Sequence, residues 1–133
     1  MHRWFLVTAS LIGALSVALG AFAAHGLKQV VSPEAVATFE TGVRYQFYHA
    51  FALLIVAIIY EKYPGKLLQW AGNCFQVGII LFSGSLYVLT ALKATDTVGL
   101  SKIGLITPFG GLFFIAGWIL MVIACIKKGP VHE

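Results

Sequence analysis

The sequence predicts an all-α fold, a bundle of four transmembrane helices. Of its 133 residues, 59% are hydrophobic and only 11% are charged, and the mean hydropathy is +0.90. A soluble domain typically carries about 25% charged residues. Long stretches of the chain lack a charge, and about 20 such residues in a helix cross the hydrocarbon core of a bilayer. We predict spans at about 4–24, 41–60, 67–92 and 103–126, within one integral membrane domain covering 1–133.

The first span follows the basic start Met1–Arg3 and contains Ala21-Phe22-Ala23, which is similar to a signal-peptidase site. A secretory signal would leave a three-span protein. A permanent helix is favoured because the apolar stretch is longer than the roughly 7–15 residues of a signal. Small residues also share one face, where they would let another helix approach closely: Ser10, Gly13, Ala14, Val17, Gly20, Ala21 and Ala24.

The second helix is expected to begin near Pro33, because Ser32-Pro33-Glu34 is typical of a helix start. It would run to Tyr60, which is longer than a membrane crossing needs. Its charge-free part begins only at Tyr45, so the span draws charged residues toward the membrane. We expect its lipid-facing side to consist of Phe39, Val43, Phe47 and Ala50.

Polar residues follow one side of the third span. At 100° per residue they share an arc of about 100°: Gln69, Asn73, Gln76, Ser83, Gly84 and Tyr87, with Ile80 in the gap. Facing lipid, each unpaired polar group would cost on the order of several kcal/mol. We interpret the inner half, Gln69–Gln76, as a stripe that packs against other helices. The outer half, Ser83–Tyr87, is where we expect a site.

The fourth span carries Thr107-Pro108 near its start, followed by Gly110 and Gly111. Proline lacks an N–H, so we expect the helix to begin or kink at Pro108. The glycines permit close helix packing.

Short loops join the four spans, so both termini lie on one side of the membrane. That side holds Arg3, Lys62, Lys66, Lys127 and Lys128, and the other holds Lys28, Lys93, Lys102 and the near-membrane Arg44. The small excess of cations predicts cytoplasmic termini. The net charge of +4 is scattered over the span ends, so no nucleic-acid partner is predicted.

Polar residues from all four spans converge in the outer half, and we take them as a candidate binding site: His25, Glu40, Arg44, Tyr45, His49, Ser83, Tyr87 and Thr107. Glu40 and Arg44 are spaced i,i+4 and can pair on one helix face. Ionisable residues within a membrane span are functional candidates by default. Structural roles are the alternatives: an interfacial Glu–Arg anchor, a packing His49, and a His25 that caps the first helix.

No catalytic motif is present, neither Gly-x-Ser-x-Gly nor His-Glu-x-x-His. Cys74 and Cys125 form no Cys-x-x-Cys pair, and His25 with His49 lacks a third metal ligand. We therefore predict no enzyme, no cofactor and no metal site.

Four stretches together carry a resemblance: Gly20–Leu27, Phe39–Ala50, Leu81–Tyr87 and Ile106–Gly111. Nearly the whole chain resembles the small membrane family known as domain of unknown function 423, related to transmembrane protein 256. One departure is Ala23, where the family often has glycine. The resemblance implies a four-helix protein of the bacterial plasma membrane with its first segment retained. It implies no activity, substrate or site residue.

Three functions stay open at this point. The favoured one is binding of a lipid, a small molecule or a partner helix through the outer-half polar cluster. The alternative is an oligomeric transporter or channel subunit with a polar path along the third helix. A membrane enzyme using Glu40 and His49 is the third. The expected partners are the lipid bilayer, a bound lipid and further copies of the chain.

Overall fold

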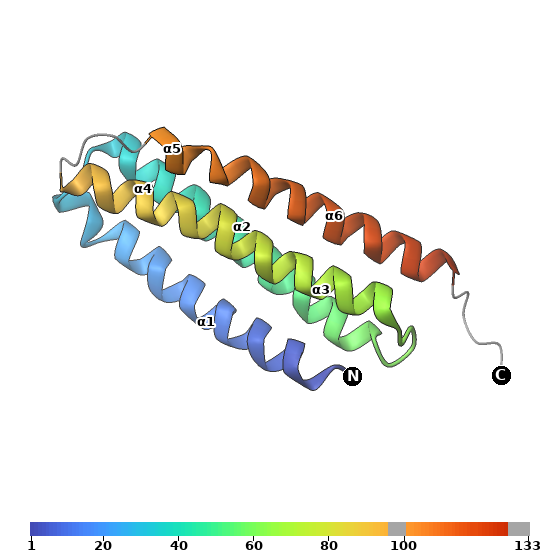
Figure 1. Ribbon diagram of the computed structural model, residues 1–133. Helices are drawn as coiled ribbons and strands as arrows, with labels where there is room; N and C mark the ends of the chain where they lie inside the picture. Colours follow the sequence, from blue (N-terminus) through green and yellow to red (C-terminus); the bar gives the residue numbers. More distant parts are fainter. Residues whose placement is uncertain (96–100, 128–133) are drawn as a thin grey trace.

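Four long helical rods lie side by side in the computed structural model, which describes residues 1–95 and 101–127 (Figure 1). The first rod is α1 (Arg3–Ala24) and the second is α2 (Pro33–Ile59), with a short 3-10 helix (Leu27–Gln29) between them. The third comprises α3 (Lys66–Gly78), a π-helical turn (Ile79–Ser83) and α4 (Gly84–Ala94). The fourth is α6 (Ile106–Lys127), preceded by the short α5 (Ser101–Gly104). Each rod is long and apolar enough to cross a membrane, and this confirms the predicted fold.

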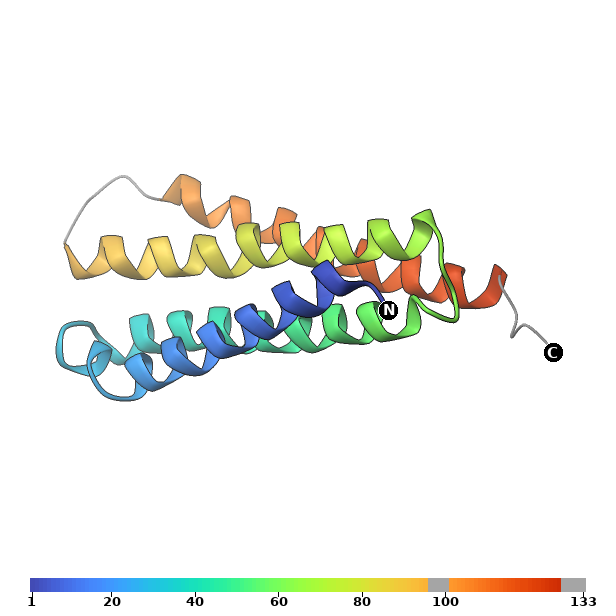
Figure 2. The same cartoon turned by 90° about the horizontal axis from the view of Figure 1, so that it is seen from below.

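The rods form two layers, with α1 beside α2 in one layer and the α3–α4 rod beside α6 in the other (Figure 2). The start of α1, the turn between α2 and α3, and the end of α6 lie at one end of the bundle (Figure 1). We call this end the inner end and the opposite end the outer end. The grouping matches the predicted topology. Cytoplasmic termini stay a prediction from the positive-inside rule.

Sequence signals set the starts of α2 and α6. The Ser32 side chain accepts a hydrogen bond from the Ala35 N–H at 3.3 Å, and Pro33 follows as the first helical residue. The regular helix before α6 is interrupted at Leu105, and Pro108 lies in the first turn of α6. A proline is tolerated there because its missing N–H would have no intrahelical partner. The expected start near Pro108 is confirmed.

The apolar core lies mainly toward the inner end. Phe75, Leu53, Leu68 and Val56 are fully buried there, and Phe5 of α1 packs onto the same cluster. A smaller outer cluster joins Ala23, Leu27, Val36 and Phe39. Between the two clusters the bundle interior contains buried polar residues, including Gln46, His49 and Ser83.

The buried face of α2 differs from the expected one. Residues at helical spacing of three and four point inward: Phe39, Gly42, Gln46, His49, Leu53 and Val56. Phe39 is 6% exposed and Ala50 is 5% exposed, so their assignment to the lipid side is wrong, and Val43 and Phe47 are half-buried. Charged residues need not point inward near a helix end, because side chains there can reach headgroups and water. The inward face is therefore free for Phe39 and Ala50.

The small-residue face of α1 is also largely exposed. The buried residues of α1 lie on another face of the helix, and they are Phe5 and the small residues Ala9, Ser16 and Ala23. Most of the predicted seam, Ser10, Ala14, Val17, Ala21 and Ala24, lies exposed. Only Gly13 and Gly20 border the packed face; a Cβ on Gly20 would lie 3.6 Å from Val43 Cγ1. The expected packing seam is therefore wrong for most of its members.

The π-helical turn Ile79–Ser83 changes the side-chain phase of the third rod. A π-turn holds roughly one residue more than an α-turn, so residues after it are rotated relative to a uniform 3.6-residue period. Ser83 is fully buried, whereas Asn73 and Ile80 are exposed, although the uniform period placed all three on one arc. The polar stripe is thus two separate faces.

Candidate functional site in the outer half of the bundle

A chain of hydrogen bonds crosses three helices in the middle of the bundle. The Tyr87 hydroxyl of α4 donates to Gln46 Oε1 of α2 at 2.6 Å. Gln46 Nε2 in turn donates to the Ile12 carbonyl of α1 at 3.4 Å. Helices in lipid lack a hydrophobic driving force for association, so such bonds hold them together. This chain fixes the relative positions of α1, α2 and α4.

A second contact brings α2 and α4 close at Gly42. Ser83 Oγ donates to the Gly42 carbonyl at 2.6 Å. A Cβ on Gly42 would lie 2.9 Å from Tyr87 Cε1, which is closer than ordinary contact. The absence of a side chain at Gly42 therefore permits both the Ser83 bond and the approach of the Tyr87 ring.

The link between α4 and α6 is made by two hydroxyls. Ser85 Oγ and Thr107 Oγ1 lie 2.6 Å apart, and Ser85 also donates to the Phe82 carbonyl at 2.8 Å. Within the described residues, every buried side-chain nitrogen or oxygen has a hydrogen-bond partner. Three predicted site residues, Ser83, Tyr87 and Thr107, are therefore engaged in helix packing.

The polar stripe residues in the inner half of the third rod are less buried than Ser83 in the outer half. Gln69 Nε2 donates to the Tyr60 hydroxyl at 2.9 Å, and Gln76 Nε2 donates to the Gly72 carbonyl of its own helix at 3.4 Å. Asn73 is exposed, and its side chain makes no hydrogen bond to any described residue. Of the three residues expected to pack, only Gln69 bonds to another helix in this structure. The side-chain hydrogen bonds from the third rod to other helices thus lie mainly in its outer half, while its inner half packs through apolar residues.

His49 is a buried, fully bonded packing residue in this arrangement. Its Nδ1 lies 2.7 Å from the Tyr45 carbonyl, and the Trp118 indole N–H donates to its Nε2 at 3.2 Å. Since Nε2 accepts, Nδ1 carries the proton and the ring is neutral. The ring stacks on Phe114 with centroids 3.5 Å apart and an interplanar angle of 6°. Both ring nitrogens are used within the bundle.

Of the remaining predicted site residues, His25 lies away from this polar interior and Tyr45 lies at its edge, beside His49. His25 is the C-cap of α1, where its backbone N–H donates to the Ala21 carbonyl at 3.2 Å and its side chain is exposed. Tyr45 is partly exposed, with its ring 4.6 Å from that of Phe82. Gln46 contacts Ile12, which lies 13 residues before His25, and His49 lies three residues farther toward the inner end. His25 and His49 are therefore roughly 24 Å apart along the bundle, at about 1.5 Å per residue. The described residues contain no cluster of three metal-ligating side chains.

Glu40 and Arg44 stand on the outer surface of α2. Both side chains are exposed, and together they line an open groove of about 430 Å³ whose other walls are Gly20, Val43, Phe47 and Tyr48. Glu40 also borders a second groove of about 420 Å³, beside Lys28. The ion pair that forms among the described residues is a different one, and it joins the Met1 amino group to Glu61 at 3.7 Å. The predicted Glu40–Arg44 pair is therefore not formed here.

The arrangement separates Glu40 from His49. They are nine residues apart on α2, which is two and a half helical turns. Glu40 accordingly lies on the exposed face and His49 on the buried one. The structure does not assemble an acid–base pair from these two residues.

Two residues that contribute to the polar interior, Gln46 and Trp118, are not among the site residues predicted from the sequence. Gln46 is only 2% exposed, and its spacing of four from Gly42 and three from His49 could have placed it on their face. For Trp118, the hydrogen-bond partner of His49, no residue spacing in the sequence indicates this contact. Its role depends on how α6 packs against α2, which is a tertiary fact.

Comparison with known proteins gives the chain a family but no activity. The family model described as protein of unknown function (DUF423) matches residues 19–111. The membrane protein YwdK of Bacillus subtilis is 40% identical over 92% of this chain and 96% of its own length. The inner membrane protein YgdD of Escherichia coli K12 is 36% identical over 98% of both chains.

A membrane protein of Haemophilus influenzae is 39% identical over 96% of this chain and 98% of its own. No solved structure matches the chain. The family description assigns no activity, and these relatives are all named as UPF0382 membrane proteins. Since the family model covers well over half of the sequence and the relatives cover almost all of it, the chain belongs to this family of bacterial membrane proteins of unknown function.

Proposed function

We propose that this protein is a non-enzymatic membrane protein that binds an amphipathic molecule with a zwitterionic head, such as an aminophospholipid, in the groove of Glu40 and Arg44. The observation that carries the proposal is the pair itself. Two opposite charges lie exposed one turn apart on α2, and the structure gives neither a salt-bridge partner among the described residues. Charged groups at membrane depth are retained where they have a partner to pair with.

The depth of the groove suits a lipid headgroup. Gly20 faces Val43 and lies four residues before the end of α1. Arg44 is therefore roughly 6 Å inside the end of α1, at about 1.5 Å per residue. Glu40 lies one turn nearer the outer end. An arginine at this depth reaches the phosphate level by extending its side chain outward.

The order of the charges supports an amine-bearing head. In an aminophospholipid the ammonium lies outside the phosphate, and Glu40 lies outside Arg44. The guanidinium of Arg44 can bind phosphate oxygens through two parallel hydrogen bonds, while the Glu40 carboxylate accepts from the ammonium. Val43, Phe47 and Tyr48 provide apolar surface for the glycerol and upper acyl chain.

Native mass spectrometry from mild detergent tests the proposal. Titration with phosphatidylethanolamine should give a retained one-to-one complex. Arg44→Gln should weaken retention roughly tenfold or more, because a charge-assisted hydrogen bond contributes about 1.5–3 kcal/mol. Glu40→Gln should abolish the preference for phosphatidylethanolamine over phosphatidylcholine, whose head has no N–H. Glu34→Gln and Lys93→Gln change exposed charges at the same end and should leave retention unchanged. Equal losses in all four variants would refute the site.

A second candidate, self-association, is supported by Asn73. This amide is exposed on α3 and faces away from the bundle core. An amide both donates and accepts, so two copies can bond to each other across a two-fold axis. Asn73→Cys would be tested for disulfide cross-linking in membranes, with Val88→Cys as the control on another exposed part of the rod. Equal cross-linking at both positions would exclude this contact.

A further inference from the structure

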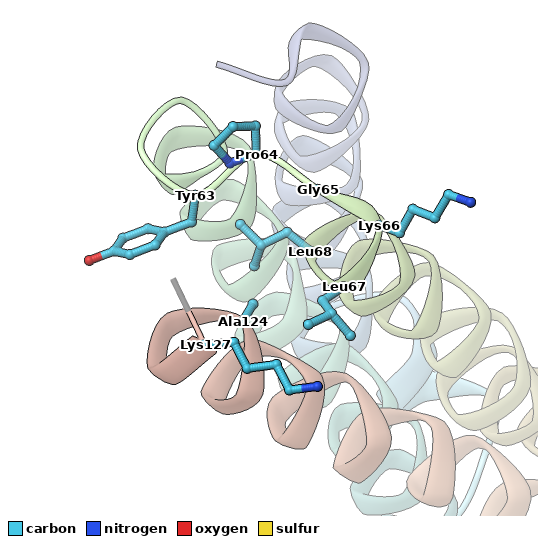
Figure 3. Close-up of a pocket in the computed structure, with 8 residues that line it drawn as sticks. All are labelled: Tyr63, Pro64, Gly65, Lys66, Leu67, Leu68, Ala124 and Lys127. Carbon is cyan, nitrogen blue, oxygen red and sulfur yellow. The ribbon is translucent and has the colours of Figure 1, made fainter. Parts of the chain in front are cut away.

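A pocket at the inner end combines an apolar floor with a basic rim. It has a volume of about 380 Å³ and lies between the turn that joins α2 to α3 and the last turns of α6. Leu67, Leu68 and Ala124 form the floor, and Figure 3 shows Lys66 and Lys127 extending on the same side with Leu67 between them. The two lysines come from different rods, so the pocket exists only in the folded bundle.

The local charge of this pocket is positive. Lys66 and Lys127 are both exposed, and no acidic residue is among the described residues that line the pocket. The acid in the adjoining turn, Glu61, lies 3.7 Å from the Met1 amino group. A third cation, Lys62, lies 5.8 Å above the Tyr63 ring and is not part of the lining. The two rim cations are therefore available to an anion.

The backbone adds to the positive potential. Gly65 is the N-cap of α3 and makes no side-chain capping bond. Its φ of 154° is one that L side chains rarely adopt, so a glycine is needed to turn the chain into α3 at this point. The first N–H groups of the 13-residue α3 lack an intrahelical acceptor. Such a helix start favours a nearby anion.

The depth of the pocket matches the phosphate layer of a membrane. Trp4 and Trp70 are 71% and 54% exposed near the inner end, and exposed tryptophans collect at the edge of the hydrocarbon core. Lys66 precedes Trp70 by one helical turn, which places it roughly 6 Å farther out. An anion at Lys66 would thus sit just outside the hydrocarbon, with Leu67 and Leu68 below it.

We propose that this pocket binds an anionic phospholipid, with its phosphate between Lys66 and Lys127 and its glycerol and upper acyl chain on the Leu67–Leu68–Ala124 floor. A soluble anion would use the rim but not the apolar floor. The proposal does not depend on the outer groove, because the two sites lie at opposite ends of the bundle and differ in charge.

The test is native mass spectrometry of the full chain with phosphatidylglycerol, and with phosphatidylcholine as the neutral lipid. The wild type should retain phosphatidylglycerol preferentially. Lys66→Gln and Lys127→Gln should each weaken retention roughly fivefold, which is about what one basic residue contributes to anionic-lipid binding. The double variant should weaken retention roughly thirtyfold, because the two contributions multiply. Lys62→Gln is the matched control: it removes one charge from the same turn and should leave retention unchanged.

Three results would overturn the proposal. One is an equal loss in Lys62→Gln and Lys66→Gln, which would indicate general charge attraction. Another is displacement of the lipid by millimolar inorganic phosphate, which would indicate a simple anion site. The third is a double variant that retains the wild-type preference. Because both lysines are exposed, thermal unfolding of the double variant should match wild type, and Lys66→Arg/Lys127→Arg should restore retention. Arg44→Gln should not affect this lipid.

Discussion

Gly110→Ala should destabilise the protein, because it puts a methyl group where α6 touches the backbone of the π-helical turn. A Cβ on Gly110 would lie 2.4 Å from the backbone nitrogen of Phe82 and 2.7 Å from its Cα. Ordinary contacts between carbons are about 3.5–4.0 Å. The obstructing atoms are backbone and cannot rotate away, so the two rods must separate locally by roughly 1 Å.

The neighbouring Gly111 provides a matched control. A Cβ there would meet nothing within 4 Å. Gly→Ala in a helix favours the folded state by roughly 0.5–1 kcal/mol, so Gly111→Ala should be neutral or slightly stabilising. Overpacking costs typically 1–3 kcal/mol. After subtracting the same helix term, Gly110→Ala should lose up to about 2 kcal/mol, and the two variants should differ by the overpacking cost of about 1–3 kcal/mol.

Reversible unfolding in mixed detergent micelles, followed by circular dichroism, would measure that difference. The expected order of stability is Gly111→Ala at or above wild type, and Gly110→Ala clearly below both. Equal stability of the two variants would mean that α6 does not meet the π-turn in this register. The helix term alone cannot produce a difference, because both residues lie in the first turns of the same helix.

The remaining predictions concern the polar interior. Tyr87→Phe removes the donor to Gln46 and should cost about 0.5–1.5 kcal/mol of unfolding free energy. Tyr45→Phe should have no such cost, because the Tyr45 hydroxyl has no hydrogen-bond partner among the described residues; equal effects would argue against the Tyr87–Gln46 bond. In nitrogen NMR of labelled protein, His49 should show a protonated Nδ1 and an unprotonated Nε2, and the opposite tautomer would contradict the Trp118 contact. Trp118→Phe should preserve the aromatic packing around His49 and leave the proton on Nδ1, because the Tyr45 carbonyl still accepts from Nδ1. It should shift the Nε2 resonance, because Nε2 loses its donor, and an unchanged Nε2 resonance would contradict the indole hydrogen bond.

Much of the fold was predictable because lipid imposes strong local constraints. Backbone groups in the hydrocarbon must be hydrogen-bonded within the chain, so charge-free stretches become helices. Ser32-Pro33 and Pro108 then set helix starts through the chemistry of single residues. These signals are local and do not depend on which helix lies next to which.

The candidate site was less predictable because its faces depend on helix phase and packing. A uniform helical period assigned Asn73 and Ser83 to the same stripe, and the π-turn between them separates these residues. No local sequence rule gives a π-turn, which persists where tertiary contacts such as Phe82 with Gly110 support it. The functional expectation for Ser83 and Tyr87 consequently becomes a packing role.

The second helix also shows that residue type alone does not predict which face of a helix is buried. A polar residue in a transmembrane span predicts that its helix face turns inward, and Gln46 and His49 do turn inward. Glu40 and Arg44 do not, because near the outer end a long charged side chain can reach the headgroups without being covered by protein. Residue type alone could not separate these two pairs. Depth along the helix and the position of α1 do so.

Photo-cross-linking in vesicles tests the central claim most directly, namely that the Glu40–Arg44 groove binds an aminophospholipid. A phosphatidylethanolamine with a photoreactive group near the glycerol would be incorporated and the labelled peptides identified by mass spectrometry. The account predicts labelling concentrated around Gly20 and Phe47–Tyr48, and lost in Arg44→Gln. Labelling spread evenly over the exposed faces of α1, α2 and α6, and unchanged in Arg44→Gln, would contradict it.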